Sequence, residues 1–317
     1  MLTHWYATLK ATEREDAINP EDNITDPLKK ADVFDADQRK RSAGKAVCPV
    51  CWRHCVIKDG ERGFCGARSA KEGTVFPANY GQVTSLALDP IEKKPFAFFK
   101  QGTMILSVGS YGCNMRCPFC QNHEIARGDD TSIRIVRMSP EALVEKALAT
   151  RVYDNIGIAF TYNEPLIGYE FVRDTARLAL QRGLETAVVT NGQIEEAPLL
   201  ELLPLITAWN IDLKAFSEEG YRKLGGRLHA TQRTIERAAA TAHVEVTTLV
   251  VPGLSDDEGD IRREAEWIAS IDRSIPLHLS RYFPRFHFDE PATPIATLKK
   301  LKAIAQESLD HVLIGNV

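Results

Sequence analysis

The sequence predicts an α/β fold in which strands and helices alternate to form a partial (β/α)6 barrel of the TIM type. The first observation is the regular order of elements from residue 101 onward. Apolar, β-rich runs are expected to form six strands at Met104–Val108, Ile156–Phe160, Thr186–Val189, Trp209–Ile211, Val244–Val250 and Leu277–Leu279. Helical patterns separate or follow them at Pro140–Arg151, Ile167–Gln181, Glu195–Leu203, Gln232–Ala242, Asp260–Ser270 and Thr297–Glu307. This alternation is typical of a parallel sheet, to which Val312–Ile314 is expected to add a late strand.

The second observation is that polar residues follow the predicted strands where each strand ends. The first strand leads into a cysteine-rich loop, and the next three end in Thr161–Pro165, Thr190–Gly192 and Asp212–Lys214. The sixth strand carries His278. In βα barrels, functional groups lie on the loops at the carboxyl ends of the strands. We therefore expect these segments to meet at one rim.

The third observation is a change of composition along the 317 residues, which predicts three regions. A polar extension is expected at 1–45, with a helix-forming piece at Asp26–Val33. Residues 46–100 are expected to bind metal and to contain short β runs at Thr74–Phe76 and Val83–Leu88, followed by a turn at Asp89-Pro90. The barrel is expected at 101–317.

Composition excludes several classes of protein. The chain has 44% hydrophobic and 26% charged residues, which is ordinary for a globular protein with a large core. A net charge of −4 argues against a general nucleic-acid surface. Neither a membrane-spanning run nor a signal peptide is evident, so we expect no membrane partner and a cytoplasmic location.

The cysteines form two groups. All seven lie between Cys48 and Cys120, four in the first group and three in the second. An odd number, divided in this way, suits two metal centres in a reducing compartment better than disulfides.

The second group is the most informative motif. Cys113, Cys117 and Cys120 are separated by three and then two residues. Three thiolates on a short loop can hold three corners of a [4Fe–4S] cluster, whose fourth iron is left open, whereas structural clusters usually take four thiolates. The alternative is a structural metal site completed by His123 or by a remote cysteine.

The first group consists of Cys48, Cys51, Cys55 and Cys65. Four thiols within 18 residues match a closed site that orders a short segment. The metal is either structural zinc or a second iron–sulfur cluster, and His54 is an alternative ligand.

The segment Gly112–Asn122 resembles the signature of the radical S-adenosylmethionine (SAM) enzymes. Together with Asp89–Pro95, Thr161–Pro165 and Pro276–Pro284, it makes residues 46–317 similar to the AmmeMemoRadiSam-system radical SAM enzyme, a relative of the pyruvate formate-lyase activating enzymes. The resemblance implies that SAM chelates the open iron. One electron then cleaves SAM to methionine and a 5′-deoxyadenosyl radical, which abstracts hydrogen from a substrate.

The resemblance also assigns roles to charged residues at the strand ends. Asn163 and Glu164 are expected to hold the SAM amino group, although Glu164-Pro165 also fits a helix start. Asp212 and Lys214 point to one side of their strand and suit the ribose hydroxyls and the SAM carboxylate. The alternative for these two residues is a solvated ion pair.

Four further residues are candidate SAM contacts, each with a structural alternative. Thr190 and Asn191 either contact the cofactor or form a strand-end turn. His278 faces the ribose or the substrate, or else lies in the core. Phe119 packs on adenine or fills the cysteine loop, and the resemblance favours adenine.

The expected function is that of a radical SAM oxidoreductase, similar in reaction class to the activating enzymes (EC 1.97.1-like). The expected partners are a one-electron reductant of the flavodoxin or ferredoxin type and a protein or small-molecule substrate. One alternative is an activase that makes a glycyl radical in a partner enzyme. An alternative of another class is a non-catalytic iron–sulfur electron carrier or zinc scaffold.

Overall fold

The computed structural model describes residues 44–317. The predicted helix at Asp26–Val33 and almost all of the predicted extension lie outside the described residues. Within the described residues, no helix combines the length and the apolar character needed to cross a membrane.

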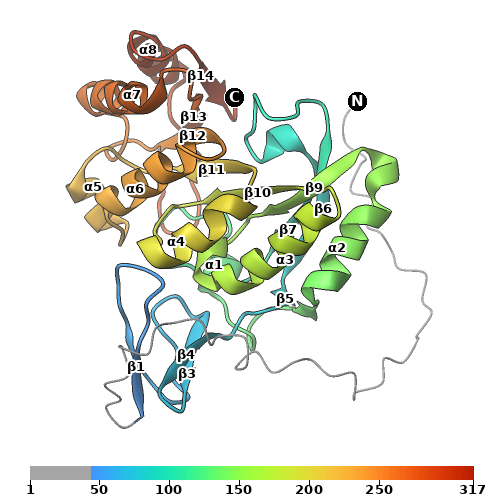
Figure 1. Ribbon diagram of the computed structural model, residues 1–317. Helices are drawn as coiled ribbons and strands as arrows, with labels where there is room; N and C mark the ends of the chain where they lie inside the picture. Colours follow the sequence, from blue (N-terminus) through green and yellow to red (C-terminus); the bar gives the residue numbers. More distant parts are fainter. Residues whose placement is uncertain (1–43) are drawn as a thin grey trace. The chain divides into compact units, whose positions relative to one another are not determined.

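One curved sheet of eight strands forms the body of the molecule (Figure 1). Its order is β14-β13-β12-β11-β10-β9-β7-β6, so the sheet is open between β14 and β6. Every pair of neighbouring strands in this sheet is parallel except β6 and β7. These parallel strands are β7 (Met104–Gly109), β9 (Asn155–Phe160), β10 (Glu185–Thr190), β11 (Ala208–Asp212), β12 (His243–Val250), β13 (Leu277–Arg281) and β14 (Val312–Gly315). The predicted α/β class, the six strands and the late seventh strand are confirmed.

Strand β6 (Ser85–Pro90) differs from the prediction. It pairs antiparallel with β7, and Asp89 and Pro90 lie opposite Ile105 and Met104 rather than in a turn. Pro90 is tolerated because β6 is an edge strand, where its missing N–H interrupts no second ladder. The sheet therefore extends across the boundary expected at residue 100.

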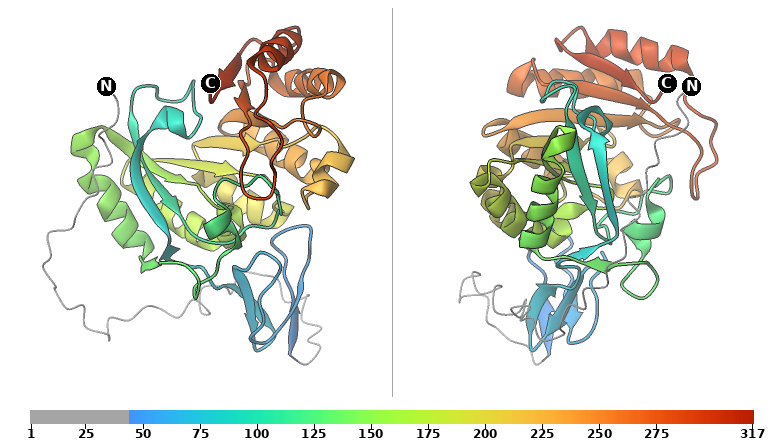
Figure 2. Two further views of the ribbon diagram at one scale, coloured as in Figure 1. Left: turned by 180° about the vertical axis from the view of Figure 1, so that it is seen from behind. Right: turned by 90° about the vertical axis from the view of Figure 1, so that its right-hand side faces the viewer.

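The predicted helices form in the connections between successive parallel strands. Figures 1 and 2 show them on the outer side of the sheet. The six expected helices are α2 (Pro140–Ala149), α3 (Tyr169–Gln181), α4 (Glu196–Leu202), α6 (Leu228–Ala239), α7 (Glu258–Asp272) and α8 (Ile295–Ala305). Two short helices were not predicted, α1 (His123–Arg127) and α5 (Glu218–Lys223). Short 3-10 turns occur at η3 (Ile91–Lys93), η4 (Arg151–Tyr153), η5 (Pro165–Gly168) and η6 (Leu203–Leu205).

Side-chain caps fix where several helices begin. The Ser139 hydroxyl accepts a hydrogen bond from the Ala142 amide, and Pro140 occupies the first turn of α2. At α7, the Asp257 carboxylate accepts from the Asp260 amide. Both caps satisfy amides that have no partner within the helix. In contrast, α6 begins four residues before the predicted start at Gln232.

The cysteine-rich segment consists of short antiparallel pairs. Strand β1 (Lys45–Val47) pairs with β2 (Val56–Lys58), β3 (Arg68–Lys71) with β4 (Thr74–Pro77), and β5 (Gln82–Val83) with β8 (Val136–Arg137). The segment is joined to the barrel loops through Arg53, whose Nε donates to the Asn114 carbonyl at 2.9 Å and whose Nη2 donates to that of Gly225 at 2.6 Å.

A buried carboxyl group gives the fold a pH-dependent contact. Thr248 Oγ1 lies within hydrogen-bond distance of the Leu213 carbonyl, at 2.9 Å, and of Glu264 Oε1. The hydroxyl has a single proton and the carbonyl can only accept, so both contacts are fully satisfied when Glu264 is protonated and donates to Thr248 Oγ1. Consistent with a protonated side chain, burial raises the pKa of Glu264 from 4.5 to about 8.

We therefore expect Glu264→Gln to stabilise the protein at alkaline pH. The folded state retains a proton that the unfolded state loses above pH 4.5, so this group's contribution decreases as pH rises from 4.5 toward about 8. Because glutamine keeps the donor, its advantage should grow by at most about 1.4 kcal/mol per pH unit in that window. Chemical denaturation at pH 5 and pH 8 measures this, with the exposed Glu266→Gln as control. An equal effect at both pH values would contradict the protonated state.

Candidate active site

Loops from four neighbouring parallel strands meet at one edge of the sheet. Strand β7 leads into the loop Cys113–Cys120, β9 into Thr161–Pro165, β10 into Thr190–Gly192, and β11 into Asp212–Lys214. Because these strands are hydrogen-bonded neighbours in the order β11-β10-β9-β7, their carboxyl ends lie side by side. The loops expected to meet at the rim after these strands are thus brought together.

The cysteine loop places its three thiols near one another. Cys117 is buried, and Cys113 and Cys120 are half-buried. Burial raises the pKa of Cys113, and the Cys117 and Cys120 thiols add to this because they lie nearby. The loop is held by a backbone hydrogen bond of 2.8 Å from the Arg116 amide to the Leu224 carbonyl.

The spacing of the thiols bears on what they could bind. In the described part of the chain, no three Cys, His, Asp or Glu side chains lie close enough together to hold one metal ion. Thiolates around a single zinc ion all lie about 2.3 Å from the same atom. In a cubane cluster each thiolate ligates a different iron, so its ligands lie further apart. Three neighbouring thiols on one loop fit such a cluster.

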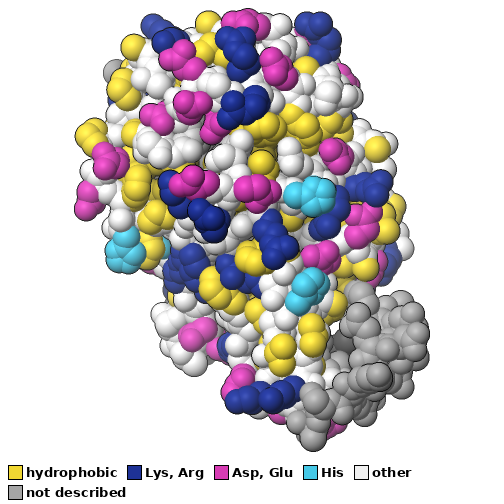
Figure 3. Space-filling view, turned by 90° about the vertical axis from the view of Figure 1, so that its left-hand side faces the viewer, with side chains coloured by type: hydrophobic (Ala, Val, Ile, Leu, Met, Phe, Trp, Pro, Cys, Tyr) yellow, Lys and Arg dark blue, Asp and Glu magenta, His cyan; other side chains and the backbone are white. Residues whose placement is uncertain are grey.

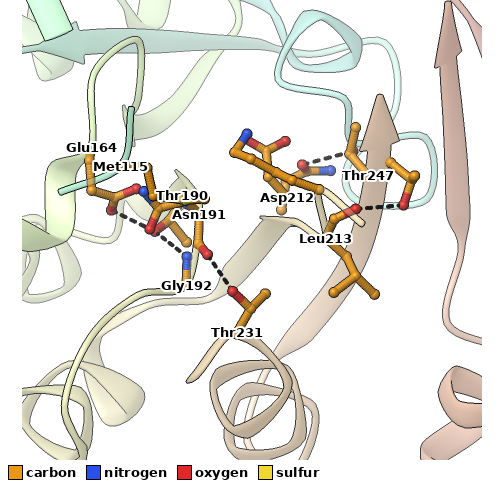
Figure 4. A network of polar contacts seen from close by, with 12 residues as sticks. Met115, Glu164, Thr190, Asn191, Gly192, Asp212, Leu213, Thr231 and Thr247 are labelled. Atoms are coloured by element: carbon orange, nitrogen blue, oxygen red, sulfur yellow. Dashed lines mark hydrogen bonds and ion pairs between the residues drawn. The ribbon is translucent and has the colours of Figure 1, made fainter. Parts of the chain in front are cut away.

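Glu164 connects the loops after β9 and β10 (Figure 4). Its carboxylate accepts hydrogen bonds from the Leu166 amide at 3.0 Å, the Thr190 hydroxyl at 2.6 Å and the Asn191 amide at 2.8 Å. It also caps the 3-10 turn η5, as the helix-start interpretation predicted. Burial raises the pKa of Glu164 to about 7, although these three donors oppose the shift.

Asn191 contacts the cysteine loop with its side-chain amide. Its Nδ2 is 3.7 Å from Cys113 Sγ and donates to Asn114 Oδ1 at 2.9 Å. Its own carbonyl accepts from the Thr231 hydroxyl at 2.8 Å, as Figure 4 shows. Amide donors next to sulfur ligands tune iron–sulfur centres. Asn191 is therefore suited to a contact with the cluster ligand.

Asn163 fixes the start of the cysteine loop. Its Oδ1 accepts from the Ser110 amide at 3.0 Å, and its Nδ2 lies 3.2 Å from the carbonyl oxygens of both Tyr111 and Gly112. These contacts occupy both ends of the carboxamide. Asn163 therefore acts on the loop rather than presenting a free group to a ligand.

Asp212 and Lys214 form an ion pair beside the cysteine loop. Lys214 Nζ lies 2.8 Å from Asp212 Oδ2, while Leu213 is buried on the other side of the strand, as the alternation predicted. Burial raises the pKa of Cys117, and the Lys214 ammonium nearby partly offsets this. The lysine therefore places a positive charge next to the thiols.

Two candidate contacts are engaged in the protein core. His278 is the second residue of β13, and its ring nitrogen lies 2.6 Å from Glu245, which also accepts from the Ala97 and Phe98 amides. It therefore lies near the amino-terminal end of its strand, away from the rim. Phe119 is 5% exposed and packs edge-to-face on an aromatic cluster, formed with Tyr282 and Phe288. For both residues, the structural alternative describes the observed contacts.

The first cysteine group surrounds a cavity of about 290 Å³, part of it open to solvent. Residues of both cysteine-containing segments line it, among them Cys48, Cys51, Arg53, Cys55, Cys65, Arg68 and Asn114. Burial raises the pKa of Cys51 to about 12. Arg68 is buried and forms an ion pair of 2.7 Å with Glu170. The four thiols are thus gathered around one space, as their spacing predicted.

A polar cluster beside the rim was missed as a possible site. The Tyr162 hydroxyl donates to Asp89 Oδ2 at 2.8 Å, and Lys94 Nζ lies 2.8 Å from the same oxygen. Tyr162 has a φ of +73°, which is uncommon for a residue with a side chain, and its carbonyl accepts from Asn122 next to the cysteine loop. The segments Asp89–Pro95 and Thr161–Pro165 were both noted in the sequence. Because they lie far apart along the chain, the contact between them could not be predicted.

Comparisons with known proteins agree with this geometry. Residues 107–265 match the model of the radical SAM superfamily, which covers half of the chain. An uncharacterized protein of Methanocaldococcus jannaschii, MJ0808, is 39% identical over 282 residues, which are 88% of this chain and 83% of the relative. Pyruvate formate-lyase 1-activating enzyme of Escherichia coli is 28% identical over 54% of this chain and 71% of its own.

Two further proteins extend the comparison. Isethionate sulfite-lyase activating enzyme of Oleidesulfovibrio alaskensis is 28% identical over 52% of this chain and 65% of its own. The crystal structure of Streptococcus suis SuiB bound to S-adenosylmethionine has a TM-score of 0.51 at 12% identity, over 65% of this chain and 48% of SuiB, which shows a shared fold. By the superfamily match over half of its length, the chain belongs to the radical SAM superfamily, whose enzymes use a [4Fe–4S] cluster and SAM.

Proposed function

We propose that Cys113, Cys117 and Cys120 hold the [4Fe–4S] cluster and that SAM binds to its fourth iron. When bound, this pair of cofactors supplies a 5′-deoxyadenosyl radical that abstracts hydrogen from a substrate. The observation that carries the proposal is a loop with three thiols, placed beside the Lys214 ammonium and the Asn191 carboxamide. The chain's own task is to bind and orient these groups and to exclude water.

The residues around the loop divide into two roles. Asp212 and Lys214 are half-buried and charged, so we assign the SAM ribose to Asp212 and the SAM carboxylate to Lys214. Asn163, Glu164 and Thr190 are assigned to positioning, because their hydrogen bonds are already made within the protein. For His278 and Phe119 we propose structural roles instead of SAM contacts.

We propose a second metal site at Cys48, Cys51, Cys55 and Cys65. The shared cavity supports it, since four thiols around one space are suited to a Cys₄ centre. The sequence left zinc and an iron–sulfur cluster as alternatives.

We propose a protein or peptide as the substrate. The relatives named above include activating enzymes of pyruvate formate-lyase and of isethionate sulfite-lyase, which favours an activase as the specific candidate. A small-molecule substrate is the alternative.

We propose that the electron donor is an acidic carrier of the flavodoxin or ferredoxin type. Its docking site would be the arginine–aromatic surface, defined by Trp52, Arg53, Phe64, Arg116 and Arg227. The Arg53 guanidinium lies 3.5 Å from the ring centre of Phe64, which precedes Cys65. Figure 3 shows one face of the molecule, on which Lys and Arg side chains lie among Asp, Glu and His side chains.

Anaerobic turnover tests the proposal. The protein is reconstituted with iron and sulfide, reduced with titanium(III) citrate and given SAM, and we expect methionine and 5′-deoxyadenosine in equal amounts. Absence of 5′-deoxyadenosine would leave only the non-catalytic carrier or scaffold. Adding candidate glycyl-radical enzymes should then give a glycine-centred EPR signal if the chain is an activase. Cleavage of SAM without such a signal would favour another substrate.

A further inference from the structure

A backbone hydrogen bond joins a cysteine of the first group to a cysteine of the second. The Cys113 amide donates to the Cys65 carbonyl at 3.2 Å, so a member of one group is bonded to a member of the other. The adjoining Gly112 has a φ of +91°, and a Cβ built on it would lie 2.5 Å from the Cys65 oxygen. The close approach of the two segments therefore requires glycine at this position.

A second connection passes through Asn114. This residue is 1% exposed and lines the cavity of the first cysteine group, although it directly follows Cys113 in sequence. Its Oδ1 accepts from Asn191 Nδ2, which lies 3.7 Å from Cys113 Sγ. Its Nδ2 donates to the Gln193 carbonyl at 2.7 Å, which fixes the side chain. The same residue thus borders the cavity and the three-cysteine loop.

The chemistry of the cavity favours a group that changes its charge. Arg53 and Arg68 line it together with the four thiols. A guanidinium nearby stabilises the additional negative charge of a reduced cluster, whereas zinc has no redox chemistry. The guanidinium charge beside the thiols therefore favours an iron–sulfur cluster over zinc.

The geometry points to a redox-active iron–sulfur cluster, held by Cys48, Cys51, Cys55 and Cys65, that passes single electrons to the Cys113–Cys120 loop. The inference rests on the proposed function, since it takes that loop as the site of the SAM-binding cluster. The path runs from Cys65 Sγ along its own backbone to the carbonyl, across the hydrogen bond, and through the Cys113 amide to its sulfur.

One electron is transferred in two successive steps. A flavodoxin- or ferredoxin-type donor is oxidised by one electron and the first centre is reduced. The first centre is then reoxidised as the centre on the Cys113–Cys120 loop is reduced. No covalent bond forms or breaks, and no proton or group is transferred in either step.

Metal analysis and EPR test the inference without turnover. Anaerobically purified wild type should contain about eight iron atoms per chain, and Cys113→Ala about four, still with a cluster signal on reduction. Cys48→Ser/Cys51→Ser should lose the first centre and keep about four. One zinc ion per chain in place of the second set of iron would overturn the inference.

The route of the electron is tested by comparing two reductants. With reduced flavodoxin, Cys48→Ser/Cys51→Ser should form 5′-deoxyadenosine at least about tenfold more slowly than wild type. With titanium(III) citrate, which can reach the SAM-binding centre directly, the two proteins should agree within about twofold. Equal rates with flavodoxin would overturn the relay.

A milder substitution tests whether a loss of activity results from misfolding. Cys55 is only half-buried, so Cys55→Ser should fold while altering the same centre. It should show the same selective loss with flavodoxin, whereas an equal loss with both reductants would assign the thiols a structural role only. If wild type itself forms no 5′-deoxyadenosine with titanium(III) citrate, the proposed function fails. In that case, the iron content and the EPR signal of Cys113→Ala still test whether the first group of cysteines holds an iron–sulfur cluster.

Discussion

Replacing Cys113 with alanine is expected to reduce 5′-deoxyadenosine formation to background and to remove about four iron atoms per chain. The Cys113 amide keeps its hydrogen bond to Cys65 in this variant, so the loop retains its backbone contact. The Cys113 side chain is half-buried, and alanine keeps its Cβ while adding no polar group and no volume. The loss should therefore come from the missing thiolate and not from unfolding.

Iron content, circular dichroism and anaerobic turnover with titanium(III) citrate measure this result together. Cys55→Ser is the matched control, because it removes a thiol from the other group and should retain turnover with this reductant. If Cys113→Ala keeps its iron and still cleaves SAM, the three-thiol site is wrong.

Lys214→Met is expected to weaken SAM binding by about ten- to a hundredfold, because a hydrogen bond to a charged group contributes about 1.5–3 kcal/mol. The Lys214 ammonium lies against Asp212 and near Cys117, where the SAM carboxylate is proposed to bind. Methionine has a similar length but no charge, so the change removes the ammonium while filling most of its space. Equilibrium binding of SAM to the reconstituted protein measures the effect.

Lys223→Met provides the control for this experiment. Lys223 is an exposed residue of α5 that pairs with Glu219, and the same substitution there should leave SAM affinity unchanged. Equal affinities in Lys214→Met and in wild type would show that the SAM carboxylate binds elsewhere.

The strands of the barrel could be predicted because each is a compact apolar run between polar loops. Val244–Val250 and Ile156–Phe160 lie within observed strands nearly to the residue. Strand β6 was misjudged at its end because Asp89-Pro90 is a common turn signal, and only pairing with β7 shows that it stays extended. The early start of α6 has a similar cause, since Arg227 provides no side-chain cap that the sequence could signal.

The site could be predicted as far as strand order places it. The positions of Asp212 and Lys214 on one side of the strand follow from the two-residue period. The position of His278 along its strand could not be predicted, because a residue near the start of a strand and one near its end look alike in sequence. The roles of Asn163 and Glu164 could not be predicted either, since the amides that donate hydrogen bonds to them come from other loops.

The link between the cysteine groups is invisible in sequence. Cys65 and Cys113 lie far apart along the chain, and the hydrogen bond joins backbone groups that every residue possesses. Gly112 was the available signal, because a glycine beside a ligand loop often marks close backbone approach. The reason why glycine is needed at this position is the nearby Cys65 carbonyl, which the sequence alone does not reveal.

The central claim is that one iron of the cluster on the Cys113–Cys120 loop is left for SAM. Electron–nuclear double resonance on the reduced protein tests it most directly, with SAM labelled by nitrogen-15 in the amino group and oxygen-17 in the carboxylate. The account predicts hyperfine coupling of both labels to the cluster, in wild type and in Cys48→Ser/Cys51→Ser. An unchanged spectrum after addition of SAM, with neither label coupled, would contradict it.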